Sequence, residues 1–139
     1  MSDKIFVDTN ILVYCFDSSE MIKKEKAVGI LENLWETSTG VLSLQVLKEF
    51  FVIVTAKLPE KMDFKSAKTA VTDLFSWNLF MENRDSLKKS FEIIQKYQFS
   101  FWDANILSAA ILSDCNKIYT EDLQHGQKIE GVEIFNPFL

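Results

Sequence analysis

The sequence has 139 residues, of which 47% are hydrophobic and 25% are charged, a composition typical of one globular domain with its own core. Acidic residues outnumber basic ones by 20 to 15, and the net charge of −5 disfavours general binding to nucleic acid, because phosphate is repelled at long range. No apolar stretch reaches the ~18 residues of a membrane-spanning helix, and no signal-peptide pattern is present. Cys15 and Cys115 lack the spacing of a metal site and are expected to be reduced. We therefore expect one cytoplasmic domain over residues 1–139 that does not enter a membrane.

Short apolar segments alternate with longer helical patterns along the whole chain. In chain order, they predict a strand at 4–7, helices at 10–16 and 19–36, a strand at 41–42, helices at 44–57 and 64–77, a strand at 78–81, helices at 85–97 and 101–114, and strands at 117–120 and 132–135. Ser43, Asp63 and Ser100 are predicted to cap the helices that follow them. Strands joined by helices imply a parallel sheet with helices on both faces. The predicted fold is α/β, a three-layer α/β/α sandwich around a short-stranded parallel sheet of four or five strands.

Three acidic residues follow predicted strands closely. Asp8 directly follows the first strand, Asp122 comes two residues after the strand at 117–120, and Asp103 lies in the first turn of the helix at 101–114. Because ligands of open α/β sheets bind beyond the carboxyl ends of the strands, these side chains are expected to meet at one edge. Each also has a simpler interpretation: Asp8 as a helix cap, Asp103 as a partner of the helix dipole, and Asp122 as a turn residue.

A fourth acid, Glu49, lies less than two turns into the helix at 44–57, and topology alone does not decide where it points. It can also be an ordinary exposed helix residue. Gln45 precedes it by four residues and therefore shares its helix face, which is the polar one.

Carboxylates gathered without cysteine or clustered histidine favour a hard divalent cation, Mg²⁺ or Mn²⁺. Such an ion can polarise a phosphodiester and activate water for hydrolysis. Thr9 and Asn10 can cap the next helix while hydrogen-bonding a carboxylate or a metal-bound water. His125 is the only histidine, so a reaction that needs two imidazoles is excluded, and His125 itself is expected in a loop. The predicted ligands and catalytic residues are Asp8, Glu49, Asp103 and Asp122.

Four stretches, in order, resemble the PIN-domain family, and most of all the VapC-like toxins of toxin–antitoxin pairs: FVDTNILVY, SLQVLKEFF, SFWDANILSAA and IYTEDLQHGQKIEGVEIFNPF. The resemblance implies a PIN fold and an endoribonuclease that needs Mg²⁺ or Mn²⁺ and cuts single-stranded regions of tRNA, rRNA or mRNA. It also implies a homodimer and a cognate antitoxin partner. Residues matching the family's motifs are the acids Asp8, Glu49, Asp103 and Asp122 and the polar helpers Asn10 and Thr120.

The chain departs from the family pattern at Asn105, where similar sequences usually carry an apolar residue. We expect Asn105 at the surface, with contact to the site as the alternative. Two other functions remain open from the sequence. One is a non-catalytic PIN-like module that binds RNA or protein. The other is a phosphate-transfer domain with Asp8 as nucleophile, although the accompanying residues of such domains are not evident.

Overall fold

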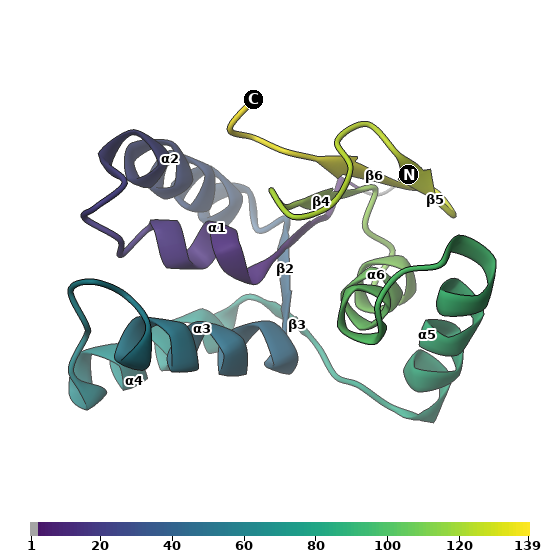
Figure 1. Cartoon of the computed structure of the whole chain (residues 1–139), viewed down its shortest axis with the longest axis horizontal. Coiled ribbons are helices and arrows are strands. Elements are labelled where there is room, and N and C mark those ends of the chain that lie inside the picture. Colours follow the sequence, from purple (N-terminus) through teal and green to yellow (C-terminus); the bar gives the residue numbers. More distant parts are fainter. Residues whose placement is uncertain (1–2) are drawn as a thin grey trace.

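The computed structural model describes residues 3–139, which form a central sheet with helices packed around it (Figure 1). The strands are β1 (Ile5–Val7), β2 (Gly40–Ser43), β3 (Asn78–Phe80), β4 (Lys117–Tyr119), β5 (Lys128–Ile129) and β6 (Val132–Phe135). The helices are α1 (Thr9–Tyr14), α2 (Met21–Thr37), α3 (Leu44–Ala56), α4 (Phe64–Asp73), α5 (Arg84–Tyr97) and α6 (Phe101–Leu112), with a 3₁₀ turn at Leu74–Ser76. None of the helices within residues 3–139 combines the length and apolarity needed to cross a bilayer.

The sheet confirms the α/β sandwich but has six strands rather than four or five, in the order β3-β2-β1-β4-β6-β5. The strand missed is β5, which pairs antiparallel with β6, while the other neighbours are parallel. With only two residues, β5 is too short to show an alternating pattern. Its turn to β6 consists of Glu130 and Gly131, both at positive φ, as in the tight turns that suit the twist of hairpins.

The strand order places a crossover beside β1. The chain runs outward from β1 to β2 and β3, then returns through α5 and α6 to β4 on the other side of β1. The position where the direction of winding changes leaves a crevice at the carboxyl ends of the two strands. Val7 and Tyr119 are register partners at these ends, so the residues after them, Asp8 and Thr120, begin side by side.

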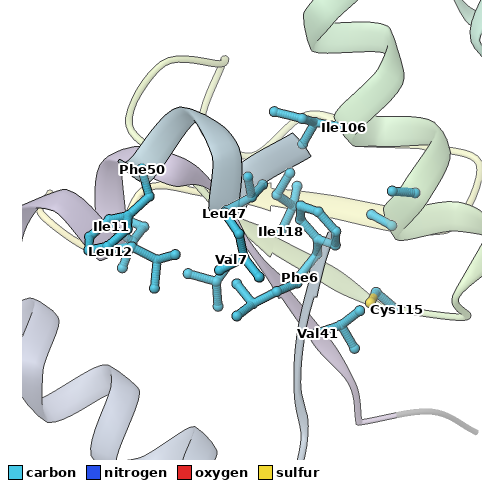
Figure 2. Packing of buried hydrophobic residues seen from close by; sticks show 14 of the residues in the cluster. Phe6, Val7, Ile11, Leu12, Val41, Leu47, Phe50, Ile106, Cys115 and Ile118 are labelled. Carbon is cyan, nitrogen blue, oxygen red and sulfur yellow. The ribbon is translucent and has the colours of Figure 1, made fainter. Parts of the chain in front are cut away.

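One continuous apolar core fixes this arrangement. Phe6 of β1 and Ile118 of β4 are register partners and fully buried, and they belong to the same cluster as Leu47 of α3 and Ile106 of α6 (Figure 2). In Figure 1, α2 and α6 lie on opposite sides of β2, and both contact it. The rigid ends of β1 and β4 can therefore present polar side chains above a packed interior.

Three helices begin at the caps predicted from the sequence. The side chains of Ser43, Asp63 and Ser100 accept hydrogen bonds from the backbone N–H groups three residues later. The cap of α5 is Asn83, whereas the sequence pattern started that helix at Asp85. Ser43 and Ser100 matter most for function, because they start the helices that carry Glu49 and Asp103.

Candidate active site

Asp8 stands where β1 ends and α1 begins. Its Oδ1 accepts the backbone N–H of Thr9 at 2.7 Å and caps α1, while its Oδ2 accepts the hydroxyl of Thr120 at 2.7 Å. The N-cap of α1 is therefore Asp8 itself, not Thr9 or Asn10. The same carboxylate also lies at the candidate active site, so the capping role and a role in the site are compatible. The side chain is only 6% exposed. The pKa of Asp8 is raised from 3.8 to about 6, mainly by burial and to a smaller extent by the nearby charges of Asp122 and Glu49, while its two hydrogen bonds act in the opposite direction.

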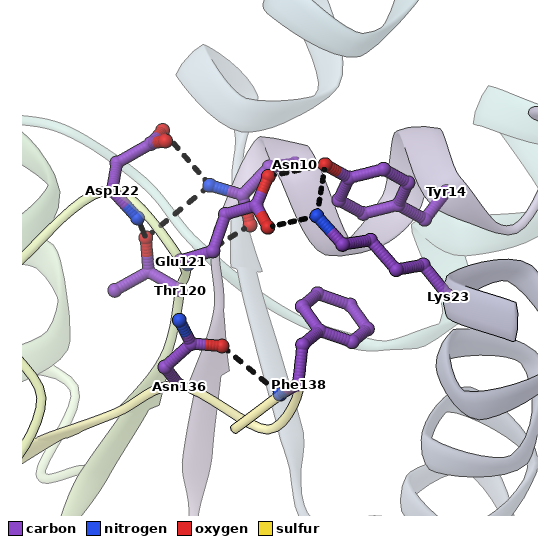
Figure 3. Close-up of polar contacts among 8 residues, drawn as sticks. All are labelled: Asn10, Tyr14, Lys23, Thr120, Glu121, Asp122, Asn136 and Phe138. Atoms are coloured by element: carbon purple, nitrogen blue, oxygen red, sulfur yellow. Dashed lines mark hydrogen bonds and ion pairs between the residues drawn. The ribbon is translucent and has the colours of Figure 1, made fainter. Parts of the chain in front are cut away.

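Asn10 joins the two strand ends. Its Nδ2 donates to Asp122 at 2.9 Å and to the Thr120 hydroxyl at 3.3 Å, and its Oδ1 accepts the backbone N–H of Glu121 (Figure 3). Thr120 also accepts the backbone N–H of Asp122. The first turn of α1 therefore fixes the loop after β4, and with it Asp122.

Glu49 faces the same site from α3. Its Oε2 accepts the Thr9 hydroxyl at 3.0 Å, and its Oε1 accepts the Gln45 amide at 3.0 Å. Gln45 in turn accepts from Asn105 of α6, and Asn105 accepts the hydroxyl of Ser90 in α5. The expectation that Asn105 is a surface substitution is thus wrong. It is half-buried and supports the residue that orients Glu49, and only the tertiary contact of α3 with α6 reveals this.

Asp103 completes the set from the first turn of α6. Its backbone is fixed by the Ser100 cap, while its carboxylate forms no hydrogen bond with another described residue. A cleft of about 300 Å³ brings all four acids into one lining, together with Thr9, Asn10 and Trp102. The residues lining it are Asp8, Thr9, Asn10, Val13, Tyr14, Asp17, Glu49, Ile53, Trp102, Asp103, Ile106 and Asp122.

Comparison with known proteins agrees with this geometry. A family model described as the PIN domain matches residues 5–128. The chain belongs to the PIN domain family. The resemblance noted in the sequence is thereby confirmed. A comparison with curated proteins found no match.

Solved structures share the PIN fold at low sequence identity. A chain of a toxin–antitoxin complex from Klebsiella pneumoniae has a TM-score of 0.70 and 21% identity, over 96% of this chain and 98% of that one. VapC20 of Mycobacterium tuberculosis, described as a toxin that cleaves the sarcin–ricin loop, has a TM-score of 0.63 and 18% identity, over 86% and 92% of the two chains. At these identities, the likeness establishes the fold.

The donor set of the PIN domain fits a hard divalent cation by its chemistry. The four acids offer only oxygen, and His125 is not among the cleft residues; it accepts the backbone N–H of Asn136 instead. Within residues 3–139, however, no three Asp, Glu, His or Cys side chains lie close enough together to form a set of metal ligands as they stand. Binding of a cation would therefore require the carboxylates to move towards one another. Asp103 is the least restrained of the four acids, because its carboxylate forms no hydrogen bond with the rest of the described chain.

A second polar cluster, which the sequence did not indicate, borders the cleft (Figure 3). Lys23 of α2 donates to Glu121 at 3.0 Å and to the Tyr14 hydroxyl at 3.2 Å, and Tyr14 donates to the same carboxylate. The Lys23 ammonium also lies 4.8 Å from the centre of the Tyr14 ring and 5.6 Å from that of Phe138. Glu121 thereby anchors the turn next to Asp122 to both α1 and α2.

Proposed function

We propose that this PIN domain is a divalent-metal-dependent endoribonuclease that hydrolyses RNA phosphodiester bonds and acts as the toxin of a toxin–antitoxin pair. The observation that carries the proposal is the convergence of four carboxylates on one cleft, at the crossover of a PIN fold. Such a concentration of negative charge is unfavourable unless protons or cations offset it. Burial is the main cause of the raised pKa of Asp8, and the charges of Asp122 and Glu49 act in the same direction.

The residues that would hold Mg²⁺ or Mn²⁺ are Asp8, Glu49, Asp103 and Asp122. When bound, such a cation polarises a phosphodiester and favours attack by water in line with the leaving oxygen. The protein supplies orientation through Thr9, Asn10, Thr120 and Gln45.

These supporting residues leave coordinating capacity free. Thr9 and Thr120 occupy one hydrogen-bond position on each oxygen of Asp8, and an ionised carboxylate has about four such positions. Glu49 is held from both sides by Thr9 and Gln45, which limits its rotamers. Partners of this kind keep metal ligands in productive orientations and strengthen metal binding.

The proposed substrate is a single-stranded region of tRNA, rRNA or mRNA. The neighbouring structures include a toxin–antitoxin complex and a toxin that cleaves the sarcin–ricin loop, and we carry both features to this chain as part of the proposal. The proposed partners are a cognate antitoxin and a second copy of the chain. Antitoxin binding near the cleft would regulate access to it.

The test is RNA cleavage by purified protein with Mg²⁺ or Mn²⁺, with EDTA, and by the Asp103→Asn variant. Asp103 is chosen because its carboxylate has no hydrogen-bond partner among residues 3–139, so its replacement disturbs the fold least. Asp73→Asn is the matched control, since it makes the same chemical change at an exposed residue at the end of α4.

We expect metal-dependent cleavage by the wild type and the control, with activity abolished by EDTA and reduced at least 100-fold in Asp103→Asn. Cleavage that persists in EDTA, or that is equal in all three proteins, would contradict the proposal. Metal-independent RNA binding without any product would instead support the non-catalytic module.

A further inference from the structure

A second hollow adjoins the acid cleft and shares two of its wall residues. It has a volume of about 560 Å³ and is lined by Leu44, Gln45, Lys48, Glu49, Met81, Glu82 and Trp102. Glu49 and Trp102 line both this hollow and the cleft. A ligand whose reacting group lies in the cleft can therefore extend past these two side chains into the hollow. We call this second space the side hollow.

Trp102 is a rigid and exposed aromatic surface between the two spaces. It is 60% exposed although it precedes Asp103 directly in the first turn of α6. The helix start is fixed by the Ser100 cap, and the indole makes a T-shaped contact with the Phe101 ring, with ring centres 4.9 Å apart and planes at 78°. The backbone and one neighbouring ring thus hold the indole in place, while more than half of its surface stays open to solvent.

The chemistry of the side hollow favours a flat, uncharged group over an anion. Trp102, Leu44 and Met81 provide apolar surface, while Glu49 and Glu82 would repel a phosphate placed among them. Nucleobases are flat and uncharged, stack on aromatic side chains in single-stranded complexes, and carry amino groups that carboxylates accept.

Lys48 offers the complementary charge for the backbone that carries such a base. It is exposed, lines the side hollow and forms no ion pair with another described residue. It follows Leu47 and precedes Glu49 on α3, so its ammonium extends from the same helix that borders the cleft. A positive group here offsets part of the repulsion that an acidic protein exerts on RNA.

We propose that Trp102 stacks on an unpaired RNA base in the side hollow, next to the phosphodiester held at the acid cleft. This rests on the proposed ribonuclease function and adds to it a base-binding subsite. It also accounts for a preference for single-stranded RNA, because a base paired within a helix cannot leave its neighbours to stack on the indole.

The test uses the tryptophan fluorescence of the protein and a short single-stranded RNA oligonucleotide, with Ca²⁺ replacing Mg²⁺ so that binding is followed apart from cleavage. The chain has three tryptophans. Trp35→Phe is the matched control, because Trp35 is 51% exposed and lies near Gly40, where β2 begins. The acid cleft, in contrast, lies at the carboxyl ends of the strands. The variants of interest are Trp102→Phe, which keeps a stacking ring, and Trp102→Ala, which does not.

We expect RNA to quench the fluorescence of the wild type and of Trp35→Phe, but not that of Trp102→Phe. Measured by the mobility of labelled RNA, Trp102→Ala should bind roughly 5- to 100-fold more weakly than the wild type, with Trp102→Phe in between. The same strand annealed to its complement should cause no quenching. In cleavage assays with Mg²⁺, Trp102→Ala should raise KM more than it lowers kcat.

Each failure has a distinct meaning. If the wild type cleaves RNA and Trp102→Ala leaves KM, affinity and quenching unchanged, the ribonuclease function stands and the base subsite is wrong. If no protein cleaves RNA but quenching depends on Trp102, the subsite stands and the hydrolytic function falls. If Trp102→Ala alters only self-association in sedimentation, the side hollow is a protein contact, and the proposal is overturned.

Discussion

Replacing Asp8 by Asn should stabilise the metal-free protein at neutral pH, although it removes a central residue of the site. The carboxyl is 6% exposed, and burial raises its pKa from 3.8 to about 6. A group whose pKa is raised on folding contributes stability that is fully present below pH 3.8 and is lost as the pH rises through about 6. At 1.36 kcal/mol per pKa unit, the shift of about two units costs the folded state about 3 kcal/mol at pH 7.5.

The amide avoids this cost but loses one hydrogen bond. The Thr9 N–H can still donate to the amide oxygen, whereas the Thr120 hydroxyl loses its acceptor. A lost hydrogen bond of this kind costs about 1 kcal/mol. We therefore expect Asp8→Asn to raise the free energy of unfolding by about 2 kcal/mol at pH 7.5. Near pH 4.5 most of Asp8 is protonated in the folded state, so the gain should shrink to about zero.

The assay is urea unfolding in EDTA, followed by circular dichroism, for both proteins at pH 7.5 and pH 4.5. In a second series of measurements, Mg²⁺ should raise the free energy of unfolding of the wild type and leave that of Asp8→Asn little changed. The reason is that a ligand that binds only the folded state increases its stability. A variant that is less stable than the wild type at pH 7.5, with the same difference at pH 4.5, would show that charge burial at Asp8 is not costly.

Three further outcomes follow from the contacts around the cleft. Thr9→Val keeps the shape of the side chain but removes the hydroxyl that donates a hydrogen bond to Glu49. Calorimetric titration should therefore show that Mn²⁺ binds roughly 10- to 100-fold more weakly to this variant than to the wild type. Unchanged affinity would refute the orienting role of Thr9. Burial raises the pKa of Cys15 to about 12 and that of Cys115 to about 11. Neither thiol should therefore react with a disulfide reagent at pH 7.5 until denaturant is added. Fast reaction of the native protein would contradict the burial of these thiols. Lys23→Met should lower the free energy of unfolding by no more than about 1 kcal/mol, because the ammonium is partly exposed. Lys23→Arg should restore the stability of the wild type. A larger loss of stability in urea unfolding of Lys23→Met would show that the ion pair contributes more than a surface pair does.

The sequence predicted what local chemistry determines. Ser43 and Ser100 cap their helices through contacts three residues away, so their roles can be inferred from neighbours alone. Asp8 and Asp122 follow strands, and the parallel topology brings the strand ends together. Glu49 was placed by the family resemblance, because a position in the second turn of a helix is compatible with several directions.

Contacts between residues far apart in the chain could not be predicted from the sequence. Asn105 is separated from Gln45 by 60 residues, and only the packing of α6 near α3 turns it from an expected surface residue into a support for Glu49. Similarly, nothing local to Glu121 indicates that Lys23, 98 residues away, pairs with it. The strand β5 was missed for a different reason, since a two-residue strand carries no periodicity, although the Gly131 turn was a usable signal.

The most direct test of the account is calorimetric titration of Mn²⁺ into the wild type and into Asp103→Asn, with Asp73→Asn as control. The account predicts saturable binding by the wild type and the control, and affinity at least 10-fold weaker in Asp103→Asn, because it proposes that the acids lining the cleft bind the cation together. Equal Mn²⁺ affinity in all three proteins, or no binding by the wild type, would contradict it.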